Sequence, residues 1–193
     1  MTGIRRAAFH VPSADGFRMA ADLHLPADNA NPLPVTVFCH GFKGFKDWGM
    51  FPFLADRLAA SGRAVVRFNF SRNGIAEAGG EAFSRPDRFR AQTYGGHAED
   101  LGRVLDAIEA GEVPYADTLA RGRFAAVGHS MGGAVAVLRA AADPRIAAVA
   151  TLNAVVQLER FGPDARAALE RDGEVKVVNA RTGQILPLGR AFF

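Results

Sequence analysis

The sequence predicts an α/β protein with a mostly parallel sheet, helices on both faces and an antiparallel hairpin near the N-terminus. Short, nearly continuous apolar runs alternate with segments of helical periodicity, which is typical of parallel strands buried on both faces. A serine flanked by glycines at 128–132 lies where one such run changes into a helix. The 193 residues are 49% hydrophobic, which is enough for one compact domain with a substantial core.

The first two strands are expected at 4–11 and 16–25, paired as an antiparallel hairpin. The pair Asp15 and Gly16 is a turn signal between them. In the second run apolar residues occupy every second position from 17 to 25, which indicates a half-buried strand.

Strands and helices then alternate along the chain. Glycines at 62 and 111 are expected to end two of the helices, and the loop at 71–96 is expected to be partly irregular. The expected strands are 35–39, 64–70, 123–127 and 146–152, and the expected helices start near 51, 97 and 133. Beyond 153 the alternation of buried strands and helices ends. A charged helix at 163–172 and a hairpin of 175–178 with 184–186 are expected there.

Composition narrows the class of protein. The formal net charge of +3 is spread along the chain without a basic run, so a nucleic-acid partner is not indicated. Cys39 is the only cysteine, so no intrachain disulfide can form, which favours a reducing cytoplasm. There is no signal-peptide pattern and no apolar run long enough to span a membrane. A cytoplasmic protein without a membrane partner is expected.

The segment from Gly128 to Gly132 reads Gly-His-Ser-Met-Gly and carries the main chemical signal. A G-x-S-x-G sequence between a strand and a helix is typical of a nucleophile elbow, in which the serine takes strained backbone angles. The positive end of the following helix lies directly behind Ser130, where it favours a developing oxyanion. The alternative is a glycine-rich turn with a bystander serine.

A second motif, His40-Gly41-Phe42-Lys43-Gly44, directly follows the expected strand at 35–39. Acyl transfer needs two N–H donors aimed at the carbonyl oxygen as it becomes negative. Met131, the residue after the nucleophile, supplies one, and a loop such as that at 41–42 supplies the other. Taken alone, the loop is better explained as a strand-ending turn with a packed histidine, and the G-x-S-x-G motif is what favours the oxyanion role.

Together these motifs resemble the α/β-hydrolase superfamily, most closely its bacterial esterase and prolyl-oligopeptidase-like branch. The resemblance covers residues 4 to about 160 and implies a partial α/β-hydrolase fold that is C-terminally truncated. It divides the chain into a core at 1–155 and the start of a cap or insertion region at 156–193. It also implies Ser130 as the nucleophile of a serine esterase. The backbone oxyanion donors would be Met131 and Phe42, supported by His40, Gly41, Gly128, His129 and Gly132.

One departure from the family concerns the catalytic triad, whose order is serine, acid, histidine. None of the five histidines follows Ser130, and no later acid ends a recognisable strand in the family's position. The general base and the triad acid are therefore not identifiable. The five rings are assigned other places: His10 and His24 at the surface or a sheet edge, His97 opening a helix, His129 shaping the pocket, and His40 beneath the oxyanion loop.

Two readings follow for function. The first is hydrolysis of a small carboxylic ester, or less favourably an amide, through an acyl-serine intermediate. The second is a catalytically silent or truncated binding or scaffold module of the same fold. No metal-ligand spacing or phosphate loop is present, so no cofactor is expected. Trp48, with the phenylalanines near it, forms either an acyl-binding wall or ordinary packing. An unpaired edge at 146–152 would favour self-association.

Overall fold

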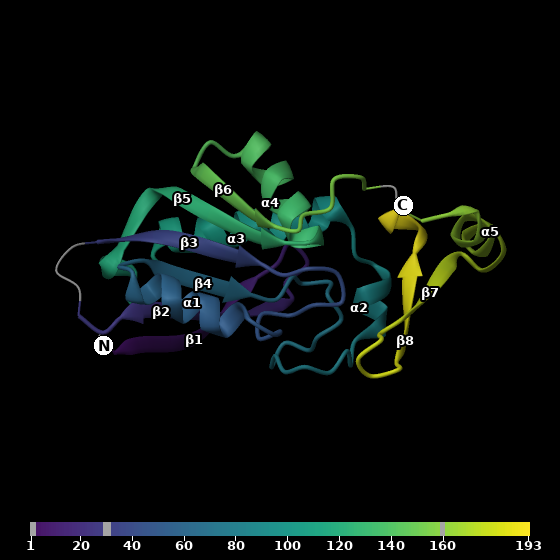
Figure 1. Cartoon of the computed structure of the whole chain (residues 1–193), viewed down its shortest axis with the longest axis horizontal. Coiled ribbons are helices and arrows are strands. Elements are labelled where there is room, and N and C mark those ends of the chain that lie inside the picture. The colour runs from purple at the N-terminus through teal and green to yellow at the C-terminus, as the bar shows by residue number, and fades with distance from the viewer. Residues whose placement is uncertain (1–2, 29–31, 159–160) are drawn as a thin grey trace.

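The computed structural model describes residues 3–28, 32–158 and 161–193. Its main feature is a six-stranded sheet in the order β1-β2-β4-β3-β5-β6 (Figure 1). The strands are β1 (Ile4–Pro12), β2 (Arg18–Pro26), β3 (Leu33–Cys39), β4 (Ala64–Phe68), β5 (Leu119–His129) and β6 (Ile146–Leu152). β1 and β2 form an antiparallel hairpin, β2 joins β4 antiparallel, and the other pairs are parallel. The predicted fold class and N-terminal hairpin are confirmed.

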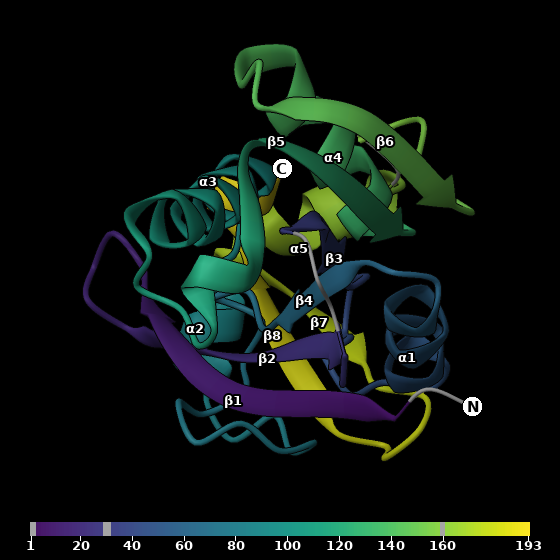
Figure 2. The ribbon, with the colours of Figure 1, turned by 90° about the vertical axis from the view of Figure 1, so that its left-hand side faces the viewer.

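Helices cover both faces of this sheet (Figure 2). α1 (Phe51–Ala60) packs over β2 and β4, where Phe38, Phe51, Ala55 and Val65 form a small core. α3 (Tyr94–Ala110) and α4 (Met131–Ala142) pack against each other and over β5, above the larger core. The two separate cores follow from the apolar character of both sheet faces.

Several element boundaries differ from the predicted ones: β5 begins at Leu119 and not at 123, β4 ends at Phe68 and not at 70, and α4 begins at Met131 and not near 133. The loop expected at 71–96 contains a short helix, α2 (Pro86–Arg90), and α3 begins at Tyr94 instead of His97. The earlier start has a local cause, because the Thr93 hydroxyl accepts a hydrogen bond from the Gly96 N–H at 2.9 Å and caps the helix. At its other end α3 stops at Gly111, which has φ 76°, as predicted.

The C-terminal region lies at the end of the molecule toward which the parallel strands point (Figure 1). It contains α5 (Pro163–Asp172) and a separate antiparallel hairpin, β7 (Glu174–Val178) with β8 (Ile185–Gly189), so the predicted helix and hairpin are confirmed. Leu186, Leu188 and Phe192 are buried in the larger core. Short 3₁₀ turns occur at Ala116–Thr118 and Arg190–Phe192.

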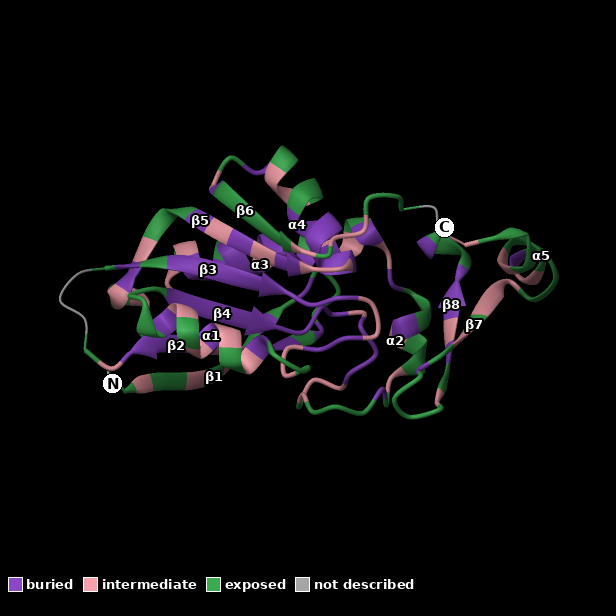
Figure 3. Cartoon of the chain, in the orientation of Figure 1, coloured by how far each residue is buried: buried purple, intermediate pink, exposed green. Residues whose placement is uncertain are grey.

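β6 forms one edge of the main sheet (Figure 3). It pairs with β5 alone, and most of its residues are exposed even though the sequence is apolar. The neighbouring α4 side chains Val137 and Leu138 are exposed as well. The predicted unpaired edge at 146–152 is therefore present in the described part of the chain.

The placement of His24 corrects a prediction. This residue was expected at the surface or an edge, but β2 lies between β1 and β4 and α1 covers that face, so His24 is buried. Its Nδ1 lies 2.8 Å from the Asp56 carboxylate, and Arg67 Nε donates to its Nε2 at 3.0 Å. Burial lowers the pKa of His24. His10, by contrast, is exposed on the edge strand β1, as expected.

Candidate active site

Ser130 occupies a strained turn between β5 and α4. Its backbone angles are φ 52° and ψ −118°, a region that side-chain-bearing residues rarely adopt, so the predicted elbow geometry is confirmed. Its N–H donates to the Leu152 carbonyl at 3.0 Å, and its own carbonyl accepts from Val155 N–H at 3.1 Å. The elbow is thus held by the end of β6 and the loop that follows.

Two glycines allow the elbow to approach the neighbouring strand. A Cβ atom at Gly128 would overlap the Gly132 carbonyl, and a Cβ atom at Gly132 would overlap the carbonyls of Cys39 and His40. Side chains at these positions are excluded by backbone atoms that cannot move aside. The start of α4 therefore packs directly on the end of β3, which brings Ser130 to the loop after that strand.

His40 fixes this loop from beneath. Its ring is buried, its Nδ1 lies 2.9 Å from the Gly41 carbonyl, and its Nε2 accepts the Phe70 N–H at 3.2 Å. These contacts assign the proton to Nδ1, which donates to Gly41. Burial lowers the pKa of His40 to about 3, so the ring is neutral at ordinary pH. The structural position expected for His40 is confirmed.

Gly41 brings the loop against the nucleophile. A methyl group added at Gly41 would lie 3.2 Å from Cβ of Ser130 and 3.0 Å from Nδ1 of His129. The first turn of α4, which begins at Met131, adjoins Ser130 along the chain, and the first N–H groups of a helix have no partner within it. Both segments predicted to supply oxyanion donors are therefore next to Ser130.

The remaining rings near the site have packing roles. His129 stacks on Trp48, with ring centroids 5.6 Å apart, and burial lowers the pKa of His129. His97 is buried, 4.4 Å from the Phe70 ring and with Nδ1 3.9 Å from a carboxylate oxygen of Asp100. Within residues 3–28, 32–158 and 161–193, no histidine ring is hydrogen-bonded to the Ser130 hydroxyl.

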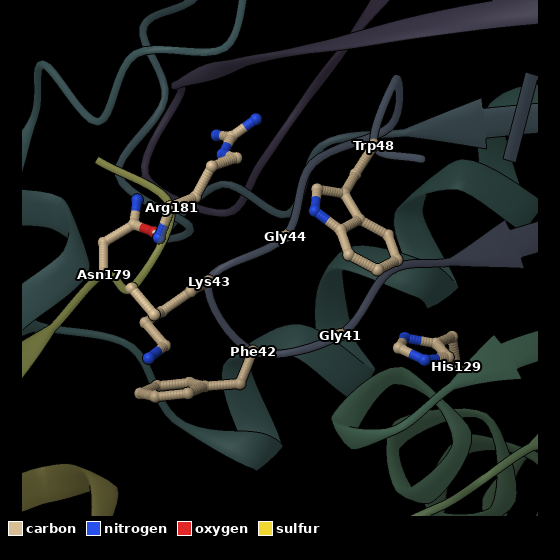
Figure 4. Close-up of a pocket in the computed structure, with 9 residues that line it drawn as sticks. Gly41, Phe42, Lys43, Gly44, Trp48, His129, Asn179 and Arg181 are labelled. Carbon is tan, nitrogen blue, oxygen red and sulfur yellow. The ribbon is translucent and has the colours of Figure 1, made fainter. Parts of the chain in front are cut away.

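A cavity of about 220 Å³ adjoins the elbow through Gly41 and His129 (Figure 4). Trp48 and Phe42 line it, whereas Phe45 and Phe51 are buried packing residues, and an acyl-binding role for the two lining rings stays a prediction. Lys43, Asn179 and Arg181 also line the cavity, and no role in the site was predicted for any of them, although Lys43 belongs to the second motif. The last two belong to the turn between β7 and β8, and nothing in a turn sequence shows which distant loop it faces.

Other chemistries find little support in the described residues. Among them, no group of three or more histidine, cysteine, aspartate or glutamate side chains is placed to hold a metal ion. Cys39 is buried beside His40, and burial raises the pKa of its thiol. No helix in the described ranges is both long and apolar enough to cross a membrane.

Comparison with known families agrees with this geometry. The model of the "Alpha/beta hydrolase family" matches residues 36–193, which include the loop after β3, the elbow and the C-terminal hairpin. The chain belongs to this family. The match confirms the resemblance seen in the sequence, and it extends beyond the part of the chain on which the resemblance rested.

Individual relatives align with different fractions of this α/β-hydrolase chain and of their own length. The "Hydrolyase poxO" of Penicillium oxalicum is 33% identical over 141 residues, which are 72% of this chain but only 31% of the relative's length. A putative hydrolase from Agrobacterium vitis S4 has a TM-score of 0.70 at 21% identity, covering 98% of this chain and 70% of its own. The α/β hydrolase GrgF from Penicillium sp. sh18 has a TM-score of 0.66 at 21% identity, covering 94% and 61%. These two structures show the shared fold.

Proposed function

We propose that the chain carries the nucleophile and oxyanion site of a serine hydrolase that acts on carboxylic esters. The observation that carries the proposal is the strained Ser130 between β5 and α4, with φ 52° and the Gly41 loop against its side chain. Strain of this kind persists where the surrounding structure holds it, and it is common at catalytic nucleophiles.

In the proposed reaction Ser130 Oγ bonds to the ester carbonyl carbon. The carbonyl oxygen becomes negative and is held by the backbone N–H groups of Met131 and Phe42, each contributing about 2.7–4 kcal/mol to transition-state stabilisation. The C–O bond to the alcohol then breaks, and the alcohol leaves with a proton. Water later cleaves the acyl-serine and restores the hydroxyl. No residue of this chain is assigned as the base that takes the Ser130 proton, and none is assigned as the acid that orients that base.

A second candidate is a catalytically silent binding module. It is supported by the lack of a histidine hydrogen-bonded to Ser130 within the described ranges. Such a module would keep the cavity and the elbow but would not form an acyl-serine. The two candidates therefore differ in one covalent product.

We also propose that residues 156–193 serve as a cap over the site, and that the protein works in the cytoplasm. The turn between β7 and β8 lines the cavity, and Lys43 of the oxyanion loop donates to the Val178 carbonyl at 2.8 Å, which ties the two regions together. The cytoplasmic proposal is supported by the single cysteine, Cys39, which is buried and unpaired.

Trapping the acyl-serine tests the proposed chemistry. Deacylation needs a base as acylation does, so acetyl transferred from p-nitrophenyl acetate is expected to accumulate on the enzyme. Peptide mass spectrometry should locate the acetyl group on Ser130 and find none in Ser130→Ala. Ser84→Ala, which alters an exposed serine, is the matched control and should still be acetylated. Unmodified Ser130 would favour the silent module.

A further inference from the structure

The cavity beside the elbow has two chemically different sides. Figure 4 shows the loop at 41–44 running between the Trp48 and His129 rings on one side and Asn179 and Arg181 on the other. Lys43 extends from this loop toward Asn179's side of the cavity (Figure 4). Of the described residues that line the space, Lys43 and Arg181 are cationic and none carries a carboxylate. An aromatic wall beside a cationic wall fits a small ligand that is apolar at one end and anionic at the other.

Lys43 retains donor capacity for such a ligand. Its ammonium donates to the Val178 carbonyl at 2.8 Å and lies 5.7 Å from the Phe42 ring centroid. An ammonium has three donors, and in the described part of the chain no acidic side chain forms an ion pair with Lys43. The residue sits at φ 56°, so the backbone of the oxyanion loop holds it in a strained position.

Arg181 adds a second positive charge that is only weakly neutralised. Its guanidinium lies 4.9 Å from the Phe45 ring centroid and 3.4 Å from a carboxylate oxygen of Glu81. Both members of this pair are well exposed, and such pairs interact weakly in water. An anion in the cavity would therefore meet little competition from Glu81.

Asn179 supplies a buried donor without an acceptor. Its side chain is buried, and its Oδ1 accepts a hydrogen bond from the backbone N–H of Arg181 at 3.2 Å, which fixes the orientation of the amide. Its Nδ2 has no hydrogen-bond partner among the described atoms. Buried amide donors are nearly always paired, and Asn179 lines the cavity, so this unpaired donor is available to a ligand that reaches it.

We infer that the cavity is a subsite for a carboxylate, so that the favoured ligands are half-esters whose free carboxylate lies a few bonds from the ester carbonyl. Lys43 and Arg181 provide the charge, the Asn179 amide provides a neutral donor, and Trp48 with Phe42 covers the carbon chain. This inference rests on the proposed esterase function and names its substrate class.

Trp48 allows a direct binding test, because it is the single tryptophan of the chain and lines the cavity. Its fluorescence is followed while Ser130→Ala, which cannot form an acyl-serine, is titrated with monomethyl succinate and with dimethyl succinate. The half-ester is expected to bind about tenfold more tightly, as a charge-assisted hydrogen bond provides. Acetoxyacetate and its methyl ester form a second pair, with the carboxylate on the alcohol side, and show which side of the ester occupies the subsite.

Charge variants made in the Ser130→Ala background show which residue causes the tighter binding of the half-ester. Lys43→Met should weaken half-ester binding about tenfold and leave diester binding unchanged. Lys176→Met, which removes an exposed ammonium on β7 outside the cavity, is the matched control. Far-UV circular dichroism checks that each variant folds. The inference is overturned when neither half-ester binds more tightly than its methyl ester, or when Lys43→Met and Lys176→Met behave alike. That result leaves acetylation of Ser130, and hence the proposed function, unaffected.

Discussion

Strands β4 and β6 have similar apolar sequences and opposite surroundings. All residues of β4 are buried, because it lies between β2 and β3 with α1 on one face and the larger core on the other. β6 lies at the sheet edge, and only Ile146 at its start is buried. An apolar run therefore predicts a strand suited to burial, but the cover itself depends on other segments.

The candidate site stands between these two environments. On the β3 side, buried His40 and the loop at 41–42 are tied to the interior by hydrogen bonds. On the β6 side, the backbone of Ser130 is hydrogen-bonded to the backbone of Leu152 and Val155, next to an exposed apolar surface. The half of the site that is proposed to hold the oxyanion is thus tied to the interior, whereas no base is proposed on the other half.

The largest expected effect is on catalytic turnover, because the half of the site without an assigned base would have to activate Ser130. With no histidine assigned to Ser130, this chain should hydrolyse an activated ester very slowly, since loss of the catalytic histidine in subtilisin costs about 2 × 10⁶ in kcat. The oxyanion site and binding would leave an acceleration of roughly 10³–10⁴ over water. Steady-state release of p-nitrophenol measures this, with Ser130→Ala as background. Turnover of tens per second would show that an upstream histidine acts as the base, and His→Ala variants would identify it.

The close packing of α4 on β3 can be tested with glycine substitutions. Gly132→Ala should destabilise the fold by about 3 kcal/mol, because its Cβ would meet backbone carbonyls. Gly95→Ala is the matched control, since Gly95 has open space and lies in α3, where alanine is favoured. Urea denaturation measures both free energies of unfolding. Equal stability of the two variants would contradict the packing described for the elbow.

The pH dependence of stability tests the neutral state of His40. The pKa of His40 is about 3 in the fold, against about 6.5 in an unfolded chain. The contribution of neutral His40 to the free energy of unfolding is therefore complete above about pH 6.5 and is lost as the pH falls toward 3. His24, whose pKa is also lowered, acts in the same direction.

We expect His40→Gln to be less stable than the unaltered chain at neutral pH and to lose less stability on acidification. Urea denaturation at several pH values measures this, with His10→Gln, an exposed substitution on β1, as the control. A steeper acid loss in His40→Gln than in the unaltered chain would contradict the assignment.

The smallest expected effect concerns the exposed edge of β6. Self-association through this edge remains a prediction, since unpaired apolar strands favour pairing between copies. Val149, which is 37% exposed, is the residue to change: Val149→Lys should shift the chain toward monomer in a light-scattering dilution series. Val178→Lys, on the separate β7 strand, should not. A stable monomer at high concentration before any substitution would count against the prediction.

Much of the fold could be predicted from the sequence because its signals are local. The elbow at 128–132, the Gly111 helix stop and the hairpin at 4–25 each depend on neighbouring residues. The burial of His24 was not predictable, since it requires knowing that β2 pairs with β4 beneath α1. The position of Asn179 in the cavity has the same cause, because a contact between remote loops leaves no mark on either segment.

The central claim is that Ser130 is a nucleophile set beside a formed oxyanion site, and fluorophosphonate labelling tests it most directly. This reagent needs less activation than an ester, so slow labelling should proceed even where no base has been assigned. Intact-mass and peptide analysis are expected to find one adduct, on Ser130, that is absent from Ser130→Ala and present in Ser84→Ala. Labelling spread over several serines, or none on Ser130, would contradict the claim.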